Sequence, residues 1–252
     1  MPEAAPPPPY RPSDPRSRLI VALDLPCLED ALKLVEALGD DVQFYKVGYR
    51  LFFAEGLPAV ERLRSLGKEV FLDLKLDDID ATIATAVEVL GGRARFLTLH
   101  GGPATIRAAV RGRGSRSLPL LLSVPLLSSV GPDELRDNLG LDGIRAPDDF
   151  LMNYLTHRAQ ATREAGADGW IASGEAIRTL REKLGDEPLI VSPGIRPAGE
   201  SSDEHRRSTD PRTALGWGAD FLVVGRPITL SSDPQGAAHR IQSEIADALA
   251  VR

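Results

Sequence analysis

The chain has 252 residues, a length that suits one closed α/β barrel or two smaller domains. Hydrophobic residues make up 42% of it and charged residues 26%, so the chain can bury a sizeable core and global disorder is excluded. The 30 Lys and Arg residues and 36 Asp and Glu residues give a net charge of −6, which argues against a protein that coats nucleic acid or an anionic membrane.

The cysteine count and the apolar runs further narrow the class of protein and its compartment. The one cysteine, Cys27, excludes an internal disulfide and a cysteine-rich metal site, which favours a reducing compartment. No apolar run reaches the ~18 residues of a membrane span, and the amino end lacks the apolar stretch of a signal peptide. We therefore expect a cytoplasmic protein with no membrane or nucleic-acid partner.

The amino-terminal segment, residues 1–16 (MPEAAPPPPYRPSDPR), is dominated by seven prolines. This composition is typical of an extended, disordered tail, although a docking peptide for a partner has it too. We expect the tail to give way to a single catalytic domain over residues 17–252.

Beyond this tail, eight short apolar runs alternate with amphipathic segments. Their near-continuous apolar character is typical of parallel strands buried on both faces. The predicted strands are Leu19–Asp24, Phe44–Gly48, Glu69–Lys75, Arg95–His100, Leu118–Val124, Gly169–Ser173, Leu189–Pro193 and Asp220–Gly225. The predicted helices between them include Leu28–Leu38, Leu57–Leu66, Ala81–Leu90 and Ala104–Val110.

Eight successive βα units in a chain of this length match a single-domain (β/α)8 TIM barrel. The alternative is an open doubly wound sheet, which would show a G-x-G-x-x-G turn after its first strand, where DLPCLED stands instead. Two connections are unusually long. Residues 130–167 predict extra helix and loop beside the fifth strand, and the polar residues 197–210 predict a lid over the catalytic face.

Polar residues recur where the predicted strands end, which is where barrel enzymes place their active sites. These residues are Asp24, Lys46, Asp73, Lys75, His100, Ser128, Ser173, Arg196 and Arg226. Any one of them could be a hydrogen-bonded strand-end group, but the whole set predicts an active site at this end of the barrel.

The densest cluster of charges is residues 73–78 (DLKLDD). Because side chains at positions i and i+2 share a face of a strand, Asp73 and Lys75 should both point into the barrel mouth. A purely structural ion pair is the alternative, but a buried pair contributes little net stability. We predict a charge array in which Asp73, Lys75, Asp78 and Lys46 alternate in sign and stabilise developing charge.

A second cluster predicts a phosphate site after the seventh and eighth strands. Gly225 permits close approach of the backbone, and Arg226 can bind a phosphate through two parallel hydrogen bonds. Arg196 is a second donor on the preceding loop.

A metal centre is a weaker interpretation of the same charges. The four histidines show no H-x-x-x-H spacing, which argues against zinc. Asp73, Asp77 and Asp78 could hold Mg²⁺, but Lys75 would compete for that space. We expect no metal.

These motifs resemble those of bacterial orotidine 5′-phosphate decarboxylases from about residue 18 to the end of the chain. The most specific match is FLDLKLDDI at Phe71–Ile79, which fits the D-x-K-x-x-D pattern of that family. Five further matches follow the family's order: VALDLP, FYKVG, the Leu127-Ser128-Ser129 turn, PGIR at Pro193–Arg196 and VVGRPIT at Val223–Thr229.

The resemblance implies conversion of orotidine 5′-monophosphate to UMP and CO₂ in de novo pyrimidine biosynthesis, without a cofactor. It implies that Lys75 stabilises and protonates a carbanion at C6 and that Asp73 disfavours the ground state of the departing carboxylate. Asp24 and Lys46 would hold the ribose, and Ser128 would contact the pyrimidine edge. The remaining family assignments are the phosphate and lid residues Arg196, His205, Gly225 and Arg226, and the residues Asp78, Ile79 and Thr82, which would reach into a neighbouring subunit's site.

A homodimer with shared active sites is therefore expected. Two other functions stay open on the sequence alone. One is a Mg²⁺-dependent sugar-phosphate decarboxylase or epimerase on the same barrel, which shares the D-x-K-x-x-D pattern. The other is a catalytically silent barrel that binds a nucleotide.

Overall fold

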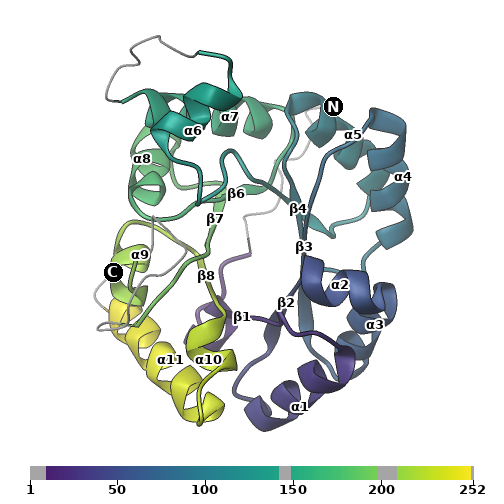
Figure 1. Cartoon of the computed structure of the whole chain (residues 1–252), viewed down its shortest axis with the longest axis vertical. Coiled ribbons are helices and arrows are strands. Elements are labelled where there is room, and N and C mark those ends of the chain that lie inside the picture. The colour runs from purple at the N-terminus through teal and green to yellow at the C-terminus, as the bar shows by residue number, and fades with distance from the viewer. Residues whose placement is uncertain (1–9, 142–148, 198–208, 251–252) are drawn as a thin grey trace, which may run out of the picture.

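A computed structural model of the chain describes residues 10–141, 149–197 and 209–250. Its eight parallel strands close into a barrel in sequence order, and β8 pairs back with β1. Helices surround the strands (Figure 1). The predicted (β/α)8 barrel is confirmed, and the open-sheet alternative is wrong.

The elements follow one another as strand and helix around the barrel. The strands are β1 (Leu19–Ala22), β2 (Phe44–Gly48), β3 (Glu69–Leu76), β4 (Phe96–Leu99), β5 (Leu120–Ser123), β6 (Gly169–Ile171), β7 (Leu189–Ser192) and β8 (Phe221–Val224). The helices are η1 (Pro15–Arg18), α1 (Leu28–Leu38), α2 (Tyr49–Glu55), α3 (Leu57–Ser65), α4 (Asp80–Leu90), α5 (Pro103–Arg113), α6 (Pro132–Asn138), α7 (Phe150–Glu164), α8 (Glu175–Leu184), α9 (Pro211–Gly216), α10 (Arg226–Thr229) and α11 (Pro234–Ala250).

The predictions for the two long connections fare differently. The first contains α6 and α7, as predicted, and its residues 142–148 lie outside the described residues. Most of the predicted lid, residues 198–208, also lies outside them, so the lid stays a prediction. None of the described helices is long and apolar enough to cross a lipid bilayer.

Alternate residues of the strands build two separate apolar layers. Inside the barrel, aromatic rings pack on one another: the Phe96 ring lies 5.1 Å from Phe44 in a tilted arrangement and 5.1 Å from Phe221 edge to face, between ring centroids. The intervening residues, such as Val21 and Leu72, face the helices and join a larger core. This two-sided burial explains why the strands read as continuous apolar runs rather than as alternating ones.

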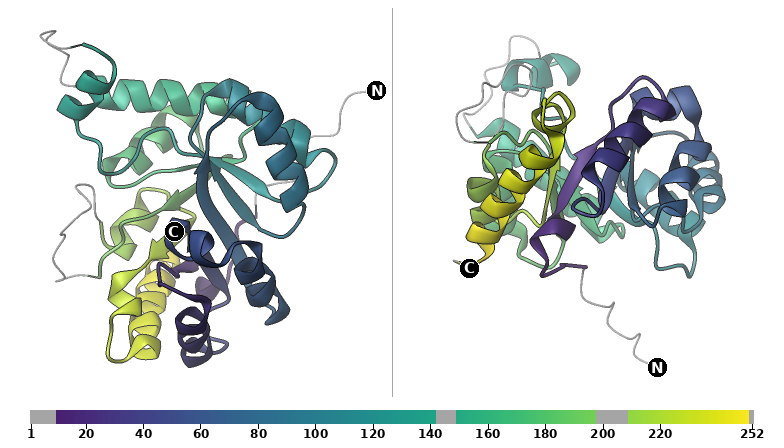
Figure 2. Two further views of the ribbon diagram at one scale, coloured as in Figure 1. Left: turned by 45° about the vertical axis from the view of Figure 1, so that its right-hand side comes forward. Right: turned by 90° about the horizontal axis from the view of Figure 1, so that it is seen from below.

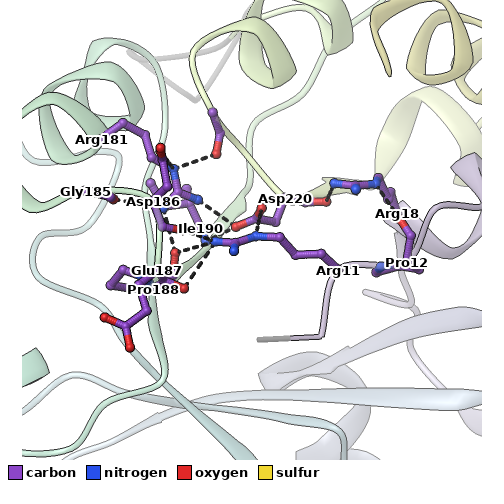
Figure 3. A network of polar contacts seen from close by, with 11 residues as sticks. Arg11, Pro12, Arg18, Arg181, Gly185, Asp186, Glu187, Pro188, Ile190 and Asp220 are labelled. Carbon is purple, nitrogen blue, oxygen red and sulfur yellow. Dashed lines mark hydrogen bonds and ion pairs between the residues drawn. The ribbon is translucent and has the colours of Figure 1, made fainter. Parts of the chain in front are cut away.

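The amino-terminal segment crosses the end of the barrel opposite the strands' carboxyl ends. Arg11 forms an ion pair with the buried Asp220 at 2.7 Å, and Arg181 binds the other oxygen of that carboxylate at 2.7 Å. Figure 3 shows Arg11 extending between Asp220 and the backbone carbonyls of residues 186–188. The Tyr10 ring stacks on the Arg95 guanidinium, 4.3 Å from the ring centroid.

The expectation of a disordered tail over residues 1–16 therefore does not hold for Tyr10 and Arg11, which pack on the barrel. Residues 1–9 lie outside the described residues. The first and the last α-helix of the chain, α1 and α11, lie side by side (Figure 2).

Candidate active site

A pocket of about 440 Å³ opens at the carboxyl ends of the strands, a volume typical of small-ligand sites. Seven strands contribute to its wall, either directly or through the loop that follows them. The predicted site residues that line it are Asp24, Lys46, Asp73, Lys75, Ser128, Arg196, Gly225 and Arg226. The structure thus brings these predicted residues together in one cavity.

The strand periodicity explains how the charges reach the pocket. Phe44 and Phe71 point into the barrel interior. Lys46 and Asp73 stand two residues later on the same strands, so their side chains continue the same inward face. The aromatic layer forms the base of the barrel interior, and the charged layer above it lines the pocket.

Four of these side chains form a chain of alternating charge. Lys46 Nζ lies 2.9 Å from Asp24 Oδ1 and 3.6 Å from Asp73 Oδ2. Lys75 Nζ lies 2.8 Å from Asp73 Oδ1. Asp73 is the most enclosed of the carboxylates, with 14% of its side chain exposed against 54% for Asp24.

The protonation state of Asp73 follows from its surroundings. Burial by itself would raise the pKa of the Asp73 carboxyl, but the charges of Lys46 and Lys75 outweigh it and lower that pKa below its ordinary value. Hydrogen bonds from Lys75 and from the Thr98 hydroxyl act in the same direction. Asp73 is therefore ionised at neutral pH between two ammonium groups.

Gly48 leaves the space that the Lys46–Asp24 pair occupies. It is on the same inward face as Lys46, and a Cβ at this position would lie 2.7 Å from Lys46 Nζ and 2.9 Å from Asp24 Oδ1. Real Cβ atoms essentially never approach that closely, so any other residue here would displace the pair.

Strand β3 is irregular where it carries Lys75. Its pairing with β4 passes from Leu72↔Leu97 to Leu76↔Leu99, so β3 has two more residues than β4 over this stretch. Lys75 has a positive φ of 46°, the left-handed region that L-residues rarely adopt. The regular strand expected from the sequence is therefore wrong at this point. Asp73 and Lys75 still meet, but across a bulge.

The other end of the pocket carries the two predicted phosphate-binding arginines. Arg196 follows β7, and Arg226 is the first residue of α10, directly after Gly225. Ser128 lines the pocket from the segment after β5. The site thus has an acidic and ammonium-rich half, from β1 to β3, and an arginine-bearing half, from the segments after β7 and β8.

Of the described residues predicted for the site, His100 and three residues around the start of α4 do not line this pocket. Asp78 and Ile79 lie on the turn between β3 and α4, and Thr82 lies in the first turn of α4; all three are exposed, Ile79 to 72%. Asp78 accepts a hydrogen bond from the backbone N–H of Ile79 at 2.6 Å. In a single chain Asp24, rather than Asp78, ends the alternating array. His205 lies outside the described residues.

Two remaining expectations for the described residues concern a metal ion and His100. Across the described ranges, no three His, Cys, Asp or Glu side chains are grouped so that they could hold a metal ion. His100 Nδ1 lies 3.0 Å from the carbonyl oxygen of Val124, which gives this histidine a hydrogen-bonding role at the end of β4.

Three residues at or beside the pocket were not predicted from the sequence. Arg50 lines it, and Tyr49 and Thr98 contact β3 behind it. Thr98 had a signal, because it is the one hydroxyl in the apolar FLTL run and stands two residues after the inward-facing Phe96. Tyr49 and Arg50 had no such signal in the sequence, because polar and aromatic residues are common in a helix that begins next to a strand end.

Comparisons with known proteins agree with this geometry. The family model described as "Orotidine 5′-phosphate decarboxylase / HUMPS family" matches residues 17–241. Curated proteins named orotidine 5′-phosphate decarboxylase from Bradyrhizobium diazoefficiens and a Methylobacterium species are each 44% identical to the chain, over 93% and 94% of it and over 96% and 99% of their own lengths.

The solved structures include a close match in fold. The crystal structure of orotidine 5′-phosphate decarboxylase from Lactobacillus acidophilus superposes with a TM-score of 0.77 at 37% identity, covering 91% of this chain and 99% of that one. A family model over most of the chain and relatives at this identity lead to one conclusion. The chain belongs to the orotidine 5′-phosphate decarboxylase / HUMPS family.

Proposed function

We propose that this protein decarboxylates orotidine 5′-monophosphate to UMP and CO₂ in de novo pyrimidine biosynthesis. The observation that carries the proposal is the alternating array Asp24–Lys46–Asp73–Lys75 in a pocket that Arg196 and Arg226 also line. The names of the relatives at 44% identity support the same substrate.

Lys75 is the proposed catalytic group. When the bond between C6 and the carboxylate breaks, its electron pair stays on a vinylic carbon that no neighbouring carbonyl can delocalise. An ammonium group aimed at C6 stabilises that charge and then donates its proton to it, which yields UMP and CO₂. The amine then regains a proton from solvent.

Asp73 and its neighbours would prepare the substrate for this step. The ionised Asp73 would lie beside the departing carboxylate and raise the energy of the bound substrate. Asp24 and Lys46 would hold the ribose hydroxyls, and Ser128 would contact the base.

Binding of the phosphate is assigned to the arginine-bearing half of the pocket. Arg196 and Arg226 would pair with its oxygens, and Gly225 would let the backbone approach. His205, in the predicted lid, would add a further contact. Binding energy from this remote group can be used to organise the reacting end.

We further propose that two copies of the chain form a dimer with shared active sites. Asp78, Ile79 and Thr82, at the start of α4 and the turn before it, are exposed, and Ile79 presents an apolar side chain to solvent. A second copy would cover Ile79 and receive Asp78 at its own array. The cytoplasm, where reducing conditions suit the free thiol of Cys27, is the proposed location.

A spectrophotometric assay with orotidine 5′-monophosphate, with and without EDTA, tests the reaction. We expect loss of the substrate's absorbance at a rate that exhaustive chelation leaves unchanged. Because the family description also covers HUMPS proteins, sugar phosphates are assayed in parallel. Turnover of a sugar phosphate that requires Mg²⁺ would replace the proposal, and UMP binding without any turnover would indicate a silent barrel.

A further inference from the structure

The peptide unit that joins Leu74 to Lys75 is held by side chains rather than by the sheet. It lies within the bulge, where the β3–β4 ladder is interrupted between Leu72 and Leu76. Its N–H, on Lys75, donates to Thr98 Oγ1 at 2.9 Å, and its C=O, on Leu74, accepts from the Tyr49 hydroxyl at 2.8 Å. Both polar groups of this one peptide are therefore satisfied from opposite sides.

This peptide determines where the Lys75 side chain starts. With φ at 46°, Lys75 is in a conformation that an unrestrained lysine leaves for the ordinary extended region. A change in φ from 46° to the extended region would redirect the Lys75 side chain and move Nζ away from Asp73. The two hydrogen bonds oppose this relaxation because both would break if the peptide rotated.

The same two side chains also contact the charged groups. The Thr98 hydroxyl donates its single proton to Asp73 Oδ1 at 2.9 Å, so its oxygen is left to accept from the Lys75 N–H. Thr98 is fully buried, which excludes water as a substitute. The ring centroid of Tyr49 lies 5.8 Å from Lys75 Nζ, within the range of a cation–π contact.

We propose that Thr98 and Tyr49 are positioning residues. They hold the Leu74–Lys75 peptide, and with it the left-handed conformation of Lys75, and so aim Lys75 Nζ at the reacting carbon. Neither residue lines the pocket, so they act through Lys75 and Asp73 rather than on the substrate. The inference rests on the proposed role of Lys75 in decarboxylation.

Substitutions at Thr98 separate its hydrogen bonds from its volume. Thr98→Val keeps the shape and removes both hydrogen bonds, whereas Thr98→Ser keeps the hydroxyl. For Thr98→Val we expect kcat to fall about 10- to 100-fold, the usual effect of misplacing a reacting group by about 1 Å, with KM within about threefold of the parent value. Thr98→Ser should restore kcat to within about threefold.

Two further variants complete the comparison. Tyr49→Phe keeps the ring and loses only the hydrogen bond to Leu74, and we expect kcat to fall about 3- to 10-fold. Thr162→Val removes another buried threonine hydroxyl, one that bonds only to carbonyls of its own helix, and should leave kcat within about twofold.

Amide hydrogen exchange of Lys75 gives a readout that needs no activity. In the parent this amide should exchange slowly, and in Thr98→Val at least about 10-fold faster, because its acceptor is gone. An unchanged kcat in Thr98→Val, an equal loss in Thr98→Ser, or unchanged exchange at Lys75 would each overturn the inference. A parent protein that fails to decarboxylate orotidine 5′-monophosphate would instead refute the proposed function, while the exchange measurement would still test the restraint of the peptide.

Discussion

Lys46 connects the two carboxylates of the array, because its ammonium group lies within 4 Å of both Asp24 and Asp73. Its side chain is only 10% exposed, so it forms these contacts with little competition from water. Removal of one partner from such a group leaves the rest as uncompensated buried charge. At the scale of single residues, the site therefore behaves as a unit, and substitutions within it should not have additive effects.

The first prediction concerns Lys75. Lys75→Ala should fold and bind UMP, because Lys75 is partly exposed and Asp73 keeps the Lys46 contact. Turnover of orotidine 5′-monophosphate should fall by about 10³-fold or more, since both the charge and the proton donor are lost. Single-turnover kinetics and UMP titration measure the two effects separately. Near-normal decarboxylation by the folded variant would contradict the assignment.

A second prediction at this scale follows from the lowered pKa of Asp73. A carboxyl whose pKa is lower in the folded chain than in the unfolded one stabilises the fold at pH values above its ordinary pKa of about 3.9, and this contribution is lost as the pH falls through the folded value. The free energy of unfolding of the parent should therefore decline more steeply on acidification than that of Asp73→Asn. Urea titrations at neutral and acidic pH measure the difference, and parallel declines would contradict it.

At the scale of elements, strand β3 shows what the sequence could and could not predict. Its apolar start and the inward position of Asp73 followed from period-two alternation, a local property. The bulge did not, because it depends on the register with β4 and on Thr98, which stands 23 residues from Lys75. The residues around Ile79 were assigned to the active site from the family resemblance. No local sequence pattern shows that they lie outside the pocket of their own chain.

Gly48 on β2 leaves room for the Lys46–Asp24 pair, and a side chain at this position should disturb the array. Gly48→Ala should retain the fold, because the atoms that its Cβ would meet are the ends of two flexible side chains. The catalytic efficiency should fall about 10-fold or more, since Lys46 and Asp24 must move out of the array. Gly92→Ala is the matched control, with nothing within 4 Å of the added Cβ. Equal efficiencies of the two variants would show that the pair tolerates displacement.

At the scale of the whole molecule, the closed barrel limits how the proposed dimer could form. The barrel closes on itself, so the sheet offers no edge strand for pairing with a second copy. A dimer must therefore use side chains of turns and helices. The exposed residues Asp78, Ile79 and Thr82, on the β3–α4 turn and the first turn of α4, are such a surface, and they adjoin the strand that carries Asp73 and Lys75.

Ile79→Glu tests this assembly. We expect a shift from dimer to monomer in sedimentation velocity together with a large loss of activity, because each site would lose the residues supplied by its neighbour. Leu66→Glu alters another exposed apolar residue, 43% exposed after α3, and should leave both properties unchanged. A fully active monomeric Ile79→Glu variant would contradict the shared site.

The contacts between the two ends of the chain have a consequence for its synthesis. The partner of β1 is β8, and Arg11 pairs with Asp220, 209 residues further along. While the ribosome is still translating, the first strand has one side without its neighbour until the eighth has emerged. Completion of the barrel is thus a late event in which nearly the whole polypeptide takes part, and a nascent chain that stalls before residue 221 keeps an open edge that other chains or chaperones can bind.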